Sequence, residues 1–69
     1  MRTPNQVVGE RLRTLRNSRR LSQSDLAERV RALGVKIQYN GVGSRERGAT
    51  ALSPSELFAF AYALDTSPL

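Results

Sequence analysis

The sequence predicts a single small all-α domain that spans residues 1–69. Three segments begin with Ser or Thr and carry Gln, Asp or Glu three residues later, which is the pattern of a capping box at a helix N-terminus. Apolar residues recur at helical spacing after the first two boxes. A chain of 69 residues, 39% of them apolar, allows one core that only narrowly outweighs the chain entropy.

The first two boxes predict the first two helices. Thr3-Pro4-Asn5-Gln6 includes a proline at the first helical position, and the helix should fray around residues 17–18. Its expected buried face has i, i+4, i+7 spacing: Val8, Leu12 and Leu15. Ser22-Gln23-Ser24-Asp25 starts the second helix, which Gly34 should end. The expected buried face of this helix is Leu26, Ala27, Val30 and Leu33.

The third box, Ser53-Pro54-Ser55-Glu56, predicts a helix that is apolar on nearly every side over residues 57–64. Its aromatic residues Phe58 and Tyr62 exceed what one helix face can bury beside Phe60. They indicate either a covering fifth helix or a dimer contact. Residues 67–69 look like the start of that fifth helix, so we expect the chain to be the N-terminal part of a longer protein.

The middle of the chain is ambiguous when it is read locally. Residues 35–39 alternate like a strand, and Asn40-Gly41 is the strongest two-residue hairpin signal. A helix here would contain Gly41 and Gly43, each of which costs about 1 kcal/mol relative to Ala. Local propensity therefore favours a β-hairpin.

Charge and composition limit the possible functions. The chain has ten Arg and one Lys but only four Glu and two Asp, which gives a net charge of +5. This charge favours a polyanionic partner, above all nucleic acid. Without Cys or His the chain lacks disulfides, the usual zinc and haem ligands and the commonest general base, so we expect no enzyme, metal or cofactor. There is no apolar run of about 20 residues and no signal peptide, so we expect a cytoplasmic protein.

Four segments in order resemble one protein family. Leu21-Ser22-Gln23-Ser24-Asp25-Leu26-Ala27-Glu28 resembles the start of the helix-turn-helix of Cro/CI-type (xenobiotic-response-element family) DNA-binding domains. Glu46-Arg47-Gly48 resembles the end of the family's recognition helix, and residues 8–16 and 57–64 resemble its first and fourth helices. The resemblance covers residues 7–69 and implies a lambda-repressor-like helix-turn-helix bundle of four to five helices. Residues 42–48 are also similar to streptomycete developmental regulators, and the Arg-rich composition is typical of GC-rich bacteria, which points to an actinobacterial transcriptional regulator.

The resemblance reverses the local interpretation of the middle segment, because it implies a recognition helix over about 38–47 in place of the hairpin. About five residues are inserted between the second helix and this one. The helix could therefore begin anywhere from Gln38 to Gly41.

The resemblance also assigns candidate site residues. The base-contacting set is the exposed part of the recognition helix: Gln38, Tyr39, Asn40, Gly43 and Ser44. The phosphate-contacting set comes from the start of the second helix and the end of the third: Ser22, Gln23, Arg45 and Arg47. Arg16 and Glu46 are implied to form a structural ion pair that locks the recognition helix onto the first helix.

The sequence is compatible with three functions. The leading one is sequence-specific binding of double-stranded DNA, as a homodimer on DNA, by a bacterial transcriptional regulator. The second is a protein-interaction or antitoxin module that binds a partner or a further domain through Phe58 and Tyr62. The third is RNA binding driven by charge alone.

Overall fold

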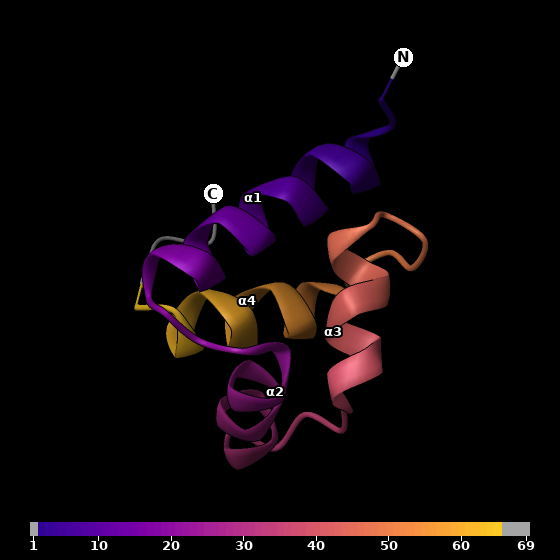
Figure 1. Cartoon of the computed structure of the whole chain (residues 1–69). Helices are drawn as coiled ribbons and strands as arrows, with labels where there is room; N and C mark the ends of the chain where they lie inside the picture. Colours follow the sequence, from indigo (N-terminus) through magenta and orange to yellow (C-terminus); the bar gives the residue numbers. More distant parts are fainter. Residues whose placement is uncertain (1, 66–69) are drawn as a thin grey trace.

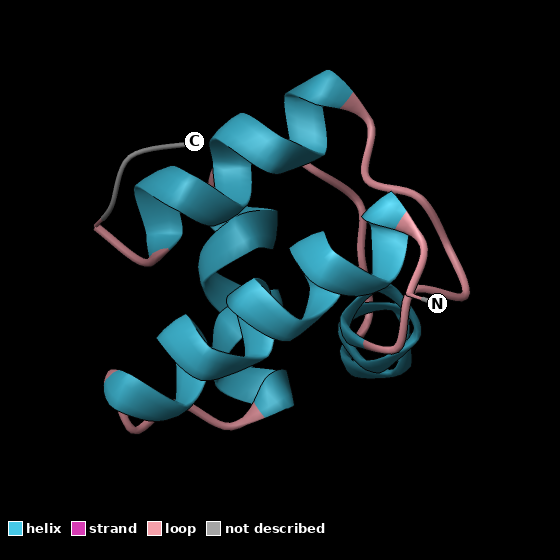
Figure 2. Cartoon of the chain, turned by 90° about the horizontal axis from the view of Figure 1, so that it is seen from above, coloured by secondary structure: helices cyan, strands magenta, loops and turns pink. Residues whose placement is uncertain are grey.

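The computed structural model describes residues 2–65, and over this range the protein is an all-α bundle with no strand. Its four helices are α1 (Pro4–Ser18), α2 (Gln23–Ala32), α3 (Tyr39–Glu46) and α4 (Pro54–Ala63). In Figure 1, α1 crosses the top of the bundle, α2 lies at the bottom, and α3 stands along one side, in contact with both. Figure 2 shows the same helices from above. The predicted all-α class is confirmed, whereas the predicted fifth helix lies outside the described residues.

Local hydrogen bonds define the start of three helices. The side-chain hydroxyl oxygens of Thr3, Ser22 and Ser53 each accept a hydrogen bond from the backbone N–H of the third helical residue. In return, the side chains of Gln6, Asp25 and Glu56 each accept a hydrogen bond from the backbone N–H of the N-cap residue. The three predicted capping boxes are therefore confirmed. Helix α3 differs, because its N-cap residue Gln38 makes no side-chain cap bond. Packing against other helices must hold α3 in place.

The core joins residues from all four helices. Leu26 and Val30 of α2, Val42 of α3, and Phe60 of α4 with Leu64 at its C-cap are almost fully buried. Leu12 of α1 and Ile37 of the α2–α3 connection complete the cluster. Val42 links α3 to this core from within a glycine-rich helix, which offsets part of the propensity cost of the glycines.

Two predicted core positions are wrong. Val8 is 41% exposed, because α1 presents Gly9 and Leu12 to the bundle and its buried face is turned by one residue. Leu33 is 44% exposed, because it is the C-cap of α2 and no longer continues the helical face.

The hairpin expected from local propensity is also wrong. Gly34 adopts φ of +93° after the end of α2, and residues 35–38 form a connection without regular structure that leads into α3. Ile37 in this connection is buried, and its carbonyl oxygen accepts a hydrogen bond from Arg31 Nη1 at 2.8 Å. Ile37 before Asn40-Gly41 and Val42 after it are thus both buried in the core. This packing takes the place of the cross-strand pairing that a hairpin would need.

Gly9 lets α1 approach the end of α3 closely. A Cβ atom at this position would overlap the backbone carbonyl oxygens of Arg45 and Glu46. By contrast, a Cβ atom at Gly41 would meet side-chain atoms and no backbone atom, with Ile37 Cγ1 at 3.1 Å and Arg45 Nη1 at 3.2 Å.

Gly9→Ala is expected to lower the melting temperature clearly, although alanine favours a helix by about 1 kcal/mol over glycine. The loss arises because α1 and α3 must separate to admit the methyl group. The matched control Gly41→Ala is expected to change the free energy of unfolding by no more than about 1 kcal/mol. Thermal unfolding followed by circular dichroism measures both, and a Gly9→Ala variant at least as stable as the wild type would contradict the close approach.

Candidate nucleic-acid interface

The exposed face of α3 is polar. Asn40, Ser44 and Arg47 follow one another at i, i+4 and i+7 and so lie on one side of the helix, while Val42 and Glu46 are buried on another. Gln38 and Tyr39 are exposed at its start. The hydroxyls of Ser44 and Thr50 lie 2.5 Å apart, so the loop after α3 is tied to this face. Of the five predicted base-contacting residues, Asn40 and Ser44 thus share one side of α3, Gln38 and Tyr39 are exposed at its start, and Gly43 is buried.

A buried ion pair holds α3 on α1. Arg16 Nε donates to Glu46 Oε2 at 2.6 Å and Arg16 Nη2 donates to Glu46 Oε1 at 3.1 Å. The two side chains are only 11% and 4% exposed. Arg16 Nη1 also donates to the carbonyl oxygen of Leu21, and Gln23 Nε2 donates to Glu46 Oε1 at 3.2 Å. The predicted pair is thus present, and Gln23 extends it to α2.

The start of α2 meets the end of α3 above Gly43. A Cβ atom built on Gly43 would lie 3.1 Å from Gln23 Nε2 and 3.2 Å from Arg47 Nη1, so both side chains cover this glycine. Gly43 is therefore buried, and its lack of a side chain serves this packing. Gln23 Nε2 keeps a second N–H beyond the one given to Glu46. Together with exposed Arg47 and the Ser22 hydroxyl, it offers donors on one patch, which we call the α2–α3 patch (Ser22, Gln23, Arg47).

Arg45 is separate from this patch. Its guanidinium forms a bidentate pair with Glu56, with distances of 3.1 and 2.8 Å, and also donates to the carbonyl oxygen of Gly41 at 3.0 Å. Arg45 was predicted to contact phosphate together with Arg47, and its pairing with Glu56 was not predicted. Glu56 also accepts the Ser53 amide in its capping box, and a glutamate in that role gives no further signal of a distant partner.

Arginines from other helices reach the C-terminal end of α4, which has no basic residue in its last turn. Arg19 donates to the carbonyl oxygens of Leu64 and Asp65 at 2.9 and 3.2 Å, and Arg29 donates to that of Ala63 at 3.4 Å. These contacts satisfy helix-end carbonyl groups and match the negative end of the helix dipole. They give Arg19 a structural role.

The outer face of α4 carries two exposed aromatic residues one turn apart. Phe58 is 63% exposed and Tyr62 is 76% exposed, while Phe60 between them is buried. The predicted excess of aromatic residues over one buried face is confirmed for residues 2–65.

Comparisons with models of known protein families, with curated proteins and with solved structures found no match to this chain. Among residues 2–65, no helix combines the length and the apolar character needed to cross a membrane. The function is therefore inferred from the site itself.

Arg16→Ala is expected to destabilise the domain by about 3–5 kcal/mol, because it leaves the buried Glu46 carboxylate without its cation. Arg13→Ala, on an exposed position of the same helix, should stay within about 0.5 kcal/mol of the wild type. Urea unfolding measures both variants. A double variant, Arg16→Met with Glu46→Leu, should regain much of the loss, since it removes the unpaired charge. Equal stability of the Arg16→Ala and Arg13→Ala variants would contradict a structural role for the pair.

The second ion pair predicts a dependence on pH. Hydrogen bonds from Arg45 hold the pKa of Glu56 below its usual value, with a smaller contribution from the Ser53 amide. A lowered pKa means that this pair stabilises the fold above the unfolded-state pKa of about 4.3 and loses its effect as the pH falls through and below it. Glu56→Gln should therefore be less stable than the wild type at pH 7, and the gap should narrow towards pH 3. A gap that stays constant in urea unfolding across this range would refute the assignment.

Proposed function

We propose that this chain is the DNA-binding domain of a bacterial transcriptional regulator and binds double-stranded DNA in a sequence-specific way, with α3 in the major groove. The observation that carries the proposal is the polar face of α3, which a buried ion pair holds at the edge of the bundle. An α-helix fits the major groove, where each base pair presents a distinct pattern of donors and acceptors. The net charge of +5 favours the same partner.

The residues divide into two roles. Asn40 can pair bidentately with adenine, and Ser44 can contact either member of a base pair. Gln38 and Tyr39 extend this set at the helix start, and we call these four residues the reading face. The α2–α3 patch contacts the backbone, since the Ser22 hydroxyl, the Gln23 amide, the Arg47 guanidinium and the first amides of α2 are all donors. Arg45 is left out of the phosphate-contacting set, because Glu56 already neutralises it, and Gly43 contributes space for Gln23 and Arg47.

The resemblance to Cro/CI-type domains adds two features to the proposal. Such domains bind as homodimers on two half-sites about one helical turn apart, because one small module offers limited interface for tight specific binding. A regulator of this kind works where bacterial DNA is, in the cytoplasm.

Exposed Phe58 and Tyr62 favour a second candidate function, a protein-interaction or antitoxin module. The two functions use different surfaces, because these aromatic residues lie on α4 and the reading face lies on α3. Phe58→Ser with Tyr62→Ser should leave the affinity of a monomeric domain for a single half-site unchanged if DNA is the partner of the reading face.

Mutations should separate base reading from backbone contact. Asn40→Ala and Ser44→Ala are expected to cost about 1–3 kcal/mol on the preferred duplex and little on random duplex, with an unchanged salt slope. Arg47→Ala should weaken both duplexes alike and lower the slope of log K against log salt by about one unit. Gln23→Ala should also weaken both, but without a change of slope, because it removes no charge.

The measurement is selection of bound sequences from random duplex DNA, followed by titration of each variant over a salt series. A selected motif with two related half-sites supports the homodimer. If Asn40→Ala and Ser44→Ala lowered both affinities in parallel, α3 would not read bases. If single-stranded RNA bound as tightly as the selected duplex at every salt concentration, the proposed DNA specificity would be refuted.

A further inference from the structure

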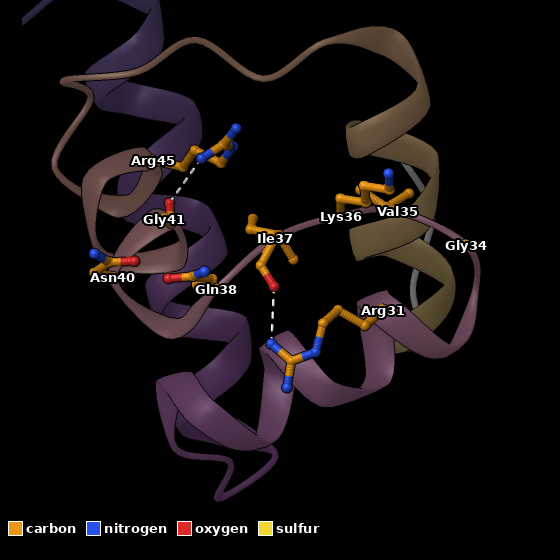
Figure 3. Close-up of a pocket in the computed structure, with 9 residues that line it drawn as sticks. All are labelled: Arg31, Gly34, Val35, Lys36, Ile37, Gln38, Asn40, Gly41 and Arg45. Carbon is orange, nitrogen blue, oxygen red and sulfur yellow. Dashed lines mark hydrogen bonds between the residues drawn. The ribbon is translucent and has the colours of Figure 1, made fainter.

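A second basic feature lies at the opposite end of α3 from Arg47. A cavity of about 670 Å³ opens between the end of α2, the connection before α3 and the first turn of α3. Figure 3 shows Gln38 and Asn40 on one side of Ile37, and Arg31 and Lys36 on the other. Neither Arg31 nor Lys36 belongs to the reading face or to the α2–α3 patch.

The cavity is positively charged. Arg31, Lys36 and Arg45 line it, and no acidic residue among residues 2–65 does so. Glu56 compensates Arg45, so Arg31 and Lys36 provide the uncompensated charge. The bond from Arg31 Nη1 to the Ile37 carbonyl oxygen holds that guanidinium in place and leaves its other N–H groups free to bind an anion. Lys36 is exposed and takes part in none of the ion pairs within the described residues.

We propose that this cavity binds a backbone phosphate of the duplex that α3 reads, and this inference rests on the function proposed above. Gln38 and Asn40 belong both to the reading face and to the cavity, so a duplex on that face comes next to Arg31 and Lys36. The eight residues of α3 rise about 12 Å, which is comparable with the roughly 12 Å width of the major groove. The cavity and the α2–α3 patch therefore contact the two backbones that border one groove.

The main variant is Lys36→Gln, because Lys36 is exposed and forms no ion pair within residues 2–65. The matched control is Arg11→Gln on α1, which is exposed and lies about 200° round the helix from Gly9. Lys36→Gln should lower the slope of log K against log salt by about one unit and weaken selected and random duplexes alike. The selected base sequence should stay the same. Arg11→Gln should leave the slope unchanged.

A chemical change in the DNA locates the contact. Uncharged methylphosphonates, placed one at a time along the selected duplex, should weaken wild-type binding at one position on the strand facing the cavity. That same position should weaken Lys36→Gln binding less than it weakens wild-type binding, because one of the two partner charges is already gone and Arg31 alone remains. Additive losses at every position would overturn the assignment.

The remaining outcomes are also decisive. An unchanged slope for Lys36→Gln, or an equal fall for Arg11→Gln, would overturn the cavity contact while sequence-specific binding stands. A wild-type domain without preference for any duplex would overturn the proposed function and this inference together. Saturable binding of inorganic phosphate to the free wild-type domain, lost in Lys36→Gln and seen by NMR at amides 31–41, together with an unchanged salt slope of Lys36→Gln on DNA, would assign the cavity to a free anion instead of DNA.

Discussion

The buried contact between Arg16 and Glu46 is the constraint on which the rest of this structure depends. It joins α1 to α3, and Gln23 bonds the same carboxylate from α2, so one Glu side chain sets the relative position of three helices. Such a pair adds little net stability over an apolar contact, but it requires one geometry, because either charge left alone would be costly. In a domain with so small a core, this requirement for one geometry contributes more to a unique fold than the net stability of the pair does.

The position of α3 has direct consequences for function. A short helix with two internal glycines and no side-chain cap bond has little stability of its own. It forms because Val42 and Glu46 are buried on its inner side and because its last turn lies against Gly9 of α1. Its outer side carries Asn40 and Arg47, which are both exposed and take part in none of the ion pairs within residues 2–65. The proposed reading face is thus a product of packing on the opposite side of the same helix.

The parts of the fold and the site that depend on interactions between neighbours in the sequence could be predicted from the sequence. The parts that depend on contacts between distant residues could not. The capping boxes at α1, α2 and α4 act over three residues, so their sequences predict those helix starts correctly. Helix α3 depends on distant contacts, and local propensity alone favours the wrong structure for it; the resemblance to a known family supplied the missing context. The pairing of Arg45 with Glu56 spans 11 positions and two elements, and nothing near either residue indicates it.

We propose that α3, held in position by the Arg16–Glu46 pair, is the surface that recognises DNA. The most direct measurement is an NMR titration of the isotopically labelled domain with its selected duplex. If α3 recognises DNA, the largest amide shift changes should fall on residues 36–47 and on the start of α2, while the outer face of α4 with Phe58 and Tyr62 stays unperturbed on a single half-site. Changes concentrated on α4, with α3 unaffected, would contradict DNA recognition by α3.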